Sequence, residues 1–128
     1  MLRLPSLGEL DRAAGAKIYL STSPTDMRKG FDTLAVLVKD FLGHDPLSGH
    51  LFLFVSRRRD RLKILYWDSD GFALWYKRLE EGTFRMPRAS SDAAGVELKA
   101  SELAMLLEGI DLRSIKRGKR LRLGPQKA

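Results

Sequence analysis

Hydrophobic and polar residues follow their most regular pattern between positions 51 and 84, in the stretch LFLFVSRRRDRLKILYWDSDGFALWYKRLEEGTF. Three runs rich in aromatic and branched residues occupy positions 51–56, 61–67 and 72–79. Charged or Asp/Ser/Gly-rich turns separate them at 57–60 and 68–71, and a further turn follows at 80–83. Short apolar runs divided by such turns are typical of an antiparallel β-meander.

Four-residue turns fix which residues of this meander share a face. Ser56 is expected opposite Arg61, and Trp67 opposite Phe72, with successive side chains alternating between faces. The face predicted to belong to the core carries Leu51, Leu53, Val55, Leu62, Ile64, Tyr66, Ala73, Trp75 and Lys77. The second face carries Phe52, Phe54, Ser56, Arg61, Lys63, Leu65, Trp67, Phe72, Leu74, Tyr76 and Arg78.

The second face has two interpretations. Aromatic side chains beside cations stack bases and neutralise phosphates, which makes this face a candidate interaction surface formed by Phe52, Phe54, Trp67, Phe72 and Tyr76. The other interpretation is that another element covers the face and leaves its basic residues at the rim. The two are compatible if the covering is partial.

The segments around the meander predict the remaining elements. Residues 17–22 are expected to form a strand. A helix is predicted over 23–42, with Ser23 as N-cap, Pro24 at the first helical position and Gly43 beyond its end. Apolar residues recur along it at helical spacing, and this stripe is expected to cover the core face of the meander.

The last third of the domain predicts shorter elements. Residues 84–88 are expected to add an edge strand that Pro87 ends, and residues 96–99 another short strand. Ser101 is expected to cap a short helix that Gly109 closes. The predicted fold class is therefore α+β: an antiparallel meander of about four to five strands, one long helix on one face, and a short C-terminal helix.

The chain of 128 residues predicts one domain over 17–112, after a lead-in over 1–16. The formal net charge is +7, and the tail over 113–128 accounts for all of it, because the rest of the chain is balanced. The basic residues of the tail are Arg113, Lys116, Arg117, Lys119, Arg120, Arg122 and Lys127. A tail without acids suggests a nucleic acid or other polyanion as partner, or else a solvated tail that aids solubility.

Composition sets further limits on the class of protein. No apolar run approaches the length of about 20 residues that a membrane span needs, and no signal peptide is visible. The chain has no cysteine, which excludes disulfides and thiolate metal sites. We therefore expect a cytoplasmic protein.

Six ordered blocks of sequence indicate a family. They are TDMRKG at 25–30, DPLSG at 45–49, LFLF at 51–54, KILYWD at 63–68, DGF at 70–72 and LWYKRLE at 74–80. In order and spacing they resemble the TnpB-type accessory proteins, the products of the second open reading frame of bacterial insertion sequences of the IS66 class. The resemblance implies a role in DNA transposition beside a separate transposase. It supplies no catalytic residue.

Residue chemistry leaves three functions to compare. A metal-dependent nuclease needs converging carboxylates, for which Asp26, Asp32, Asp60, Asp68 and Asp70 are the candidates, although turn and cap roles already explain several of them. His44 and His50 flank one loop without a third zinc ligand. No motif predicts a cofactor, and no catalytic residue is assigned.

The preferred hypothesis is a non-catalytic accessory protein that binds DNA or the transposase–DNA complex. Its predicted nucleic-acid-binding residues are Arg57, Arg58, Arg59, Arg61, Lys63 and Arg78 at one end of the sheet, together with the basic tail. The first alternative is a module that docks the transposase without intrinsic DNA affinity. The nuclease is the second alternative. Oligomeric state is left open.

Overall fold

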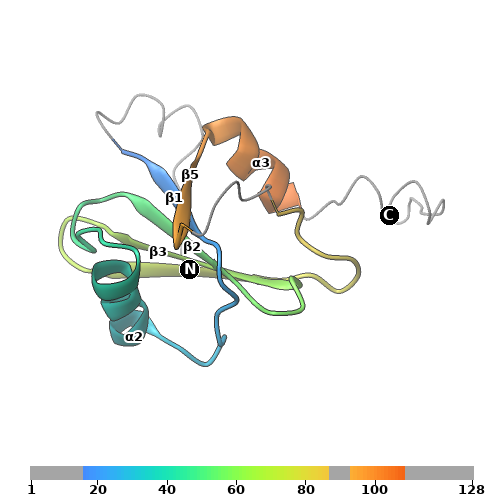
Figure 1. Cartoon of the computed structure of the whole chain (residues 1–128), viewed down its shortest axis with the longest axis horizontal. Coiled ribbons are helices and arrows are strands. Elements are labelled where there is room, and N and C mark those ends of the chain that lie inside the picture. Colours follow the sequence, from blue (N-terminus) through green and yellow to red (C-terminus); the bar gives the residue numbers. More distant parts are fainter. Residues whose placement is uncertain (1–15, 87–92, 109–128) are drawn as a thin grey trace.

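A computed structural model describes residues 16–86 and 93–108. Its centre is a five-stranded mixed sheet in the order β4-β3-β2-β1-β5. The strands are β1 (Ile18–Ser21), β2 (Leu51–Val55), β3 (Arg61–Trp67), β4 (Phe72–Arg78) and β5 (Gly95–Leu98). The helical segments are α2 (Phe31–Val36), which continues into the π-helix η1 (Leu37–Phe41), and α3 (Ala100–Glu108). Figure 1 shows α2 and α3 at separate places around the sheet.

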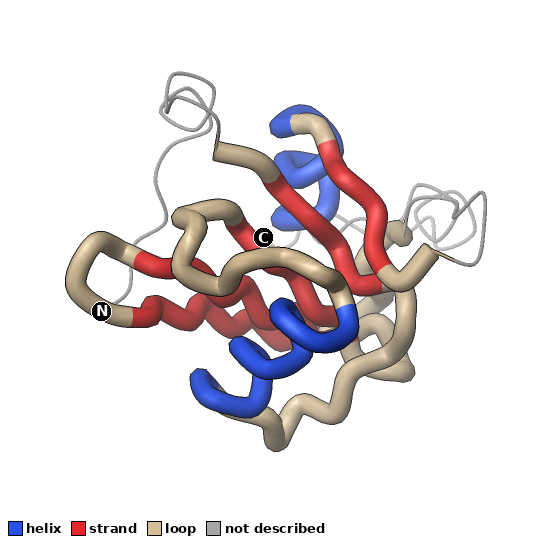
Figure 2. Tube along the Cα trace, turned by 60° about the vertical axis from the view of Figure 1, so that its left-hand side comes forward, coloured by secondary structure: helices blue, strands red, loops and turns tan. Residues whose placement is uncertain are grey.

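The predicted hairpin registers are confirmed. Phe54 lies opposite Lys63 across β2 and β3, and Trp67 lies opposite Phe72 across β3 and β4. The sheet is not a pure meander, however. β1 joins β2 in parallel and β5 in antiparallel orientation, which places the first strand between the second and the last. Figure 2 shows these strands as one layer crossed by the helix.

The predicted helix over 23–42 begins too early. The structure starts α2 at Phe31, because the preceding residues make other bonds. The amide of Thr25 donates to the carbonyl of Val55, and the carboxylate of Asp26 accepts from the amide of Arg28, two residues on. Aspartate often forms such local turns in place of a first helical turn. The predicted end is confirmed: Gly43 follows with φ of 73°, and the amide of His44 donates to the carbonyl of Val38.

The expectation that this helix covers the face of Leu53, Val55, Ile64 and Trp75 is wrong. Leu34 and Val38 pack instead on Phe52, Phe54 and Leu65, which belong to the second face. The predicted core face is buried on β2 and β3 and partly buried on β4, but the helix that covers it is α3, through Leu103 and Leu106, with Phe84 beside them. Both faces of the sheet are therefore covered, and the molecule has three layers.

Two smaller predictions in the last third also need correction. Residues 84–86 form no strand, and residues 87 and 88 lie outside the described residues. Ser101 is inside α3 rather than at its N-cap; the amide of Lys99 donates to the carboxylate of Glu102, three residues on. The strand predicted at 96–99 is confirmed as β5. The lead-in, Gly109 and the basic tail lie outside the described residues.

Candidate nucleic-acid interface

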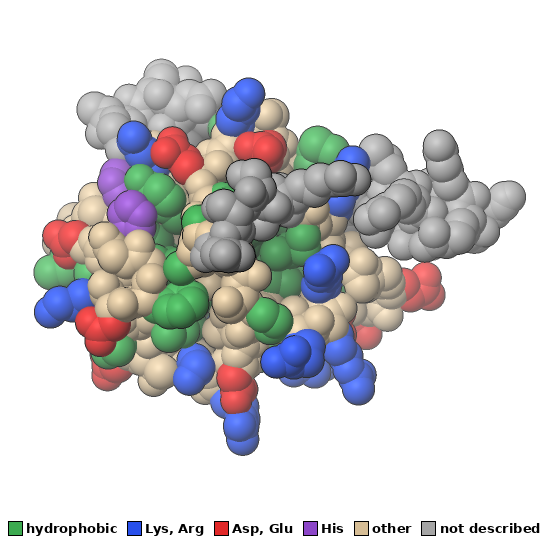
Figure 3. Space-filling model, in the orientation of Figure 1, with side chains coloured by type: hydrophobic (Ala, Val, Ile, Leu, Met, Phe, Trp, Pro, Cys, Tyr) green, Lys and Arg blue, Asp and Glu red, His purple; other side chains and the backbone are tan. Residues whose placement is uncertain are grey.

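Arginines gather at one end of the sheet, and all but the half-buried Arg61 are exposed. We call this the arginine end and define it by Arg57, Arg58, Arg59, Arg61 and Arg78. The first three occupy the β2–β3 turn and are exposed. Arg61 is the first residue of β3, and Arg78 is the last residue of β4. In Figure 3 basic side chains gather along the lower right part of the molecule.

The backbone of the turn is held firmly. The amide of Arg59 donates to the carbonyl of Ser56, and the carbonyl of Arg59 accepts from the amide of Phe84. The amide of Leu79 donates to the carbonyl of Asp60. Arg59 has a φ of 63°, in the left-handed region that most residues avoid. The turn therefore displays its side chains from a fixed frame.

The arginines of the turn have no acidic partner within the described residues. Asp60 is next to them in the chain, but its carboxylate accepts from the hydroxyl of Ser56 at 3.1 Å. Arg78 is the exception at this end, since its guanidinium binds Glu80 at 3.1 Å. Arg61 also lies directly opposite Arg78 in the sheet. Like charges in that position destabilise a sheet, so the fold tolerates a cost here.

A hollow of about 440 Å³ lies beside the turn. The residues 25–28 form one wall, and Ser56, Arg57, Arg58, Asp60 and Arg61 form the other. Asp26 and Arg28 bind each other at 2.7 Å, and the adjacent guanidinium lowers the pKa of the Asp26 carboxyl far below its usual range. Because Asp26 and Arg28 compensate each other, Arg57, Arg58 and Arg61 outnumber the one remaining acid of the hollow, Asp60.

Lys63 is a correction to the predicted site. Only 7% of this residue is exposed, and its ammonium donates to the carbonyls of Met27 and Lys29 at 2.7 Å each. It also lies 4.8 Å from the ring centre of Tyr76, and burial lowers its pKa. Lys63 therefore fastens the loop before α2 to the sheet and is not available to a phosphate. The sequence contained one signal for this buried role: Lys63 is a lysine inside an otherwise apolar strand, and the predicted register sets it between Phe54 and Tyr76.

The predicted aromatic interaction face is mostly covered. Phe52 and Phe54 are fully buried under α2, which corrects their assignment to an exposed surface. Trp67 and Phe72 are half-buried beside the β3–β4 turn, with ring centres 5.1 Å apart. Only Tyr76 of the five is exposed, at 48%. The face therefore packs as core, as the second interpretation held.

The carboxylates considered for a nuclease are dispersed. Asp26 and Asp60 line the same hollow, whereas Asp68 and Asp70 lie in the turn at the other end of the sheet. Asp32 is exposed on α2. Within residues 16–86 and 93–108, no three His, Cys, Asp or Glu side chains gather as metal ligands do.

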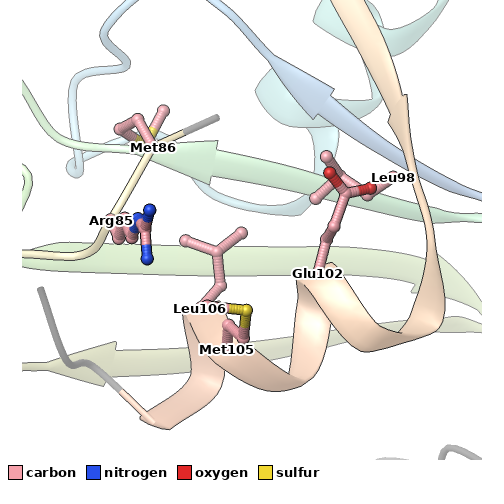
Figure 4. A pocket seen from close by; sticks show the side chains of 6 residues that line it. All are labelled: Arg85, Met86, Leu98, Glu102, Met105 and Leu106. Atoms are coloured by element: carbon pink, nitrogen blue, oxygen red, sulfur yellow. The ribbon is translucent and has the colours of Figure 1, made fainter. Parts of the chain in front are cut away.

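A smaller hollow of about 200 Å³ lies on the α3 side (Figure 4). Met105, Leu106 and Glu102 line it from α3, and Arg85 and Met86 line it from the segment after β4. Leu98 of β5 completes it. This hollow is largely apolar and stands apart from the arginine end.

Two histidines cluster at the end of the sheet remote from the arginines. Tyr19 stacks on His44 at 4.0 Å between ring centres and meets His50 edge-on at 5.7 Å. The Nδ1 atom of His50 accepts from the amide of Lys17 at 3.0 Å. Burial lowers the pKa of His50, with the neighbouring His44 and Lys17 acting in the same direction and Glu97 opposing them.

Acid is therefore expected to destabilise the protein through His50. The unfolded state takes up its proton first as the pH falls below about 6.5, so stability decreases until the pH passes the lower pKa of the folded state. His50→Asn retains an acceptor for the amide of Lys17 but does not titrate. Its thermal midpoint should fall less than that of the unmodified protein between pH 7 and pH 5, measured by circular dichroism.

The companion variant His44→Asn leaves His50 titratable but removes one of the groups that lower the pKa of His50, so its acid sensitivity should lie between those of the unmodified protein and His50→Asn. An equal acid sensitivity in the unmodified protein and His50→Asn would contradict the assignment to His50.

Comparison with known proteins decides the family. Residues 16–117 match the family model of IS66 Orf2-like proteins. The chain belongs to this family. The resemblance seen in the six sequence blocks is thereby confirmed, and the family associates the protein with transposition as an accessory to an IS66-type element.

Two relatives in Sinorhizobium fredii (strain NBRC 101917 / NGR234) share much of the sequence. The uncharacterized protein y4hO is 36% identical over 104 residues, which cover 81% of this chain and 89% of the relative. The uncharacterized protein y4jC is 37% identical over 103 residues, which cover 80% of this chain and 86% of the relative. No solved structure matches the chain. No described helix is long and apolar enough to cross a membrane.

Proposed function

We propose that this IS66 Orf2-like protein is a non-catalytic accessory protein that binds DNA, or the transposase–DNA complex, through its arginine end. The observation that carries the proposal is the exposed turn of Arg57, Arg58 and Arg59, which has no acidic partner among the described residues. Arginine pairs well with phosphate oxygens, and exposed clusters attract polyanions over a distance of about a Debye length.

The distribution of charge around the hairpins supports this end as the binding end. In the loop that faces the arginine turn, Arg28 and Asp26 compensate each other, and Lys29 beside them adds one positive charge. At the opposite end of the sheet the β3–β4 turn contains Asp68 and Asp70. The β3–β4 hairpin is therefore cationic at the arginine end and acidic at its turn, which favours approach of the arginine end to DNA.

The decisive test is a titration of a labelled duplex DNA with the purified protein, followed by fluorescence anisotropy at two salt concentrations. The same titration is repeated with the transposase of the element present. Binding that weakens steeply with salt supports the proposal. No binding in either titration would overturn it.

Removal of residues 113–128 gives a separate prediction. This tail carries seven basic residues and no acidic residue. Its deletion should therefore weaken DNA binding and flatten the salt dependence of the affinity. Each phosphate that the shortened protein no longer neutralises lowers the slope of log affinity against log salt by about 0.9 on duplex DNA. Anisotropy titrations of the shortened protein measure the slope, and circular dichroism checks the fold. An unchanged slope would mean that the tail only aids solubility.

A second candidate function is docking of the transposase without intrinsic DNA affinity. The observation that favours it is the exposure of three large apolar side chains on α2 and η1, namely Phe31 (47%), Val36 (54%) and Phe41 (49%). Exposed large apolar side chains can serve as anchors for a protein partner. Phe31→Glu with Phe41→Glu should then abolish co-purification with the transposase and leave any direct DNA binding unchanged.

A further inference from the structure

Strand β4 is an edge of the sheet along its whole length. Among the strands of residues 16–86 and 93–108, only β3 lies beside it, and it extends over seven residues, Phe72–Arg78. An edge strand presents unpaired amides and carbonyls, which can pair with another strand.

The hydrogen bonds at the two ends of the β3–β4 hairpin identify the outward groups. The amide of Asp68 donates to the carbonyl of Gly71, and the amide of Leu79 donates to the carbonyl of Asp60. Backbone groups of alternate residues point to opposite sides of a strand. The odd-numbered residues of β4 therefore bond to β3, and Phe72, Leu74, Tyr76 and Arg78 direct their backbone groups outward.

The usual protection of such an edge is weak here. Natural edges are often guarded by charged side chains, especially lysine. The ammonium of Lys77 is instead turned to the carbonyl of Leu107 in α3, at 2.6 Å. The guanidinium of Arg78 is engaged by Glu80. Tyr76, with 48% exposure, is left as the most accessible large apolar side chain of the strand.

We propose that β4 pairs with β4 of a second copy of this chain, antiparallel and centred on Trp75. In this register Leu74 exchanges both hydrogen bonds with Tyr76 of the second copy, and Phe72 does so with Arg78 of the second copy. Every outward amide and carbonyl of Phe72–Arg78 then has a partner in both copies. Any shifted register leaves some of them unpaired. The two sheets become one continuous sheet.

Charge and side-chain chemistry favour a second copy as the occupant. Antiparallel pairing places the two copies of Arg78 at opposite ends of the strand pair, whereas parallel pairing would bring these like charges side by side. On the face of α2, Tyr76 meets Leu74 of the second copy and Arg78 meets the ring of Phe72 of the second copy. Aromatic–aliphatic and cation–π pairs of this kind stabilise sheets and interfaces.

The first test is sedimentation of the full chain over a range of protein concentrations, without DNA. We expect a concentration-dependent dimer. Tyr76→Pro removes an outward amide but no bond to β3, so it should abolish the dimer while the monomer stays folded. Tyr76→Phe retains the amide and the ring beside Lys63, and it should dimerise as before. A single monomeric species at every concentration would overturn the proposal.

The second test uses single cysteines in a chain that has none. In the proposed register the two copies of Tyr76→Cys lie about 7–8 Å apart, within reach of a short thiol cross-linker. In the same register, position 70 faces position 80 of the second copy. The two copies of Asp70→Cys are therefore ten residues apart along the strands, roughly 33 Å, and should not be linked. A cross-link through position 70 but not 76 contradicts the register. A cross-link from position 76 to the transposase in place of a second copy contradicts self-pairing.

Discussion

Replacing Arg57 and Arg58 by alanine and Arg59 by glycine is expected to weaken DNA association about tenfold at low salt, with little change in thermal stability. Three exposed charge pairs with phosphate at about 0.5 kcal/mol each give this factor. Glycine is chosen at position 59 because the φ of 63° suits it. The loss should shrink as salt rises, since exposed charges act through screened attraction. Anisotropy titrations at several salt concentrations measure both effects.

The matched control removes three positive charges from the other end of the molecule. Lys17 precedes β1, Lys99 follows β5, and Lys39 lies in η1; all three are exposed. Their replacement by alanine changes the net charge by the same amount. Equal losses of binding in the two triple variants would mean that net charge alone matters and that the arginine end is not a site. Unfolding of the arginine variant would make these residues structural.

Lys63→Met should reduce the free energy of unfolding by about 2–4 kcal/mol. The substitution leaves the carbonyls of Met27 and Lys29 without the ammonium that serves both, and each buried unpaired polar group costs about 1–3 kcal/mol. Methionine fills a similar volume, so the effect reports the missing hydrogen bonds more than a change in packing. Denaturant unfolding followed by circular dichroism gives the value.

An exposed lysine provides the comparison. Lys99→Met removes the same charge where no side-chain bond depends on it, and its stability should stay within about 0.5 kcal/mol of the unmodified protein. The salt slope of DNA binding should be unchanged by Lys63→Met at temperatures where the variant is folded. A stable Lys63→Met variant with weakened, salt-dependent DNA binding would return Lys63 to the nucleic-acid-binding surface.

Local pattern predicted the hairpins well. The turns at 57–60 and 68–71 fixed the pairing of Phe54 with Lys63 and of Trp67 with Phe72, because loop length determines register. The exposure of the arginine turn agrees with the cost of burying three charges. These inferences needed only neighbouring residues, which is why they were correct.

Long-range arrangement was not predictable from the same pattern. Both faces of the meander are apolar, so the stripe of Leu34 and Val38 suited either one, and the sequence contained no signal for the choice. The parallel insertion of β1 beside β2 depends on contacts between distant segments. The start of α2 was misplaced because Ser23, Pro24 and Asp26 match a helix start, while the bonds of Asp26 and Lys63 favour an extended loop.

The interior position of β1 has a consequence for the order in which the molecule folds. The hairpins of β2, β3 and β4 close loops of a few residues, whereas β5 must meet β1 across about 75 residues of chain. Closing a long loop costs more conformational entropy, and pairings between distant segments slow folding. During synthesis β1 leaves the ribosome first and has no strand partner until β2 follows it. The β2–β4 hairpins are therefore expected to be the nucleus, and the two terminal strands complete the sheet last.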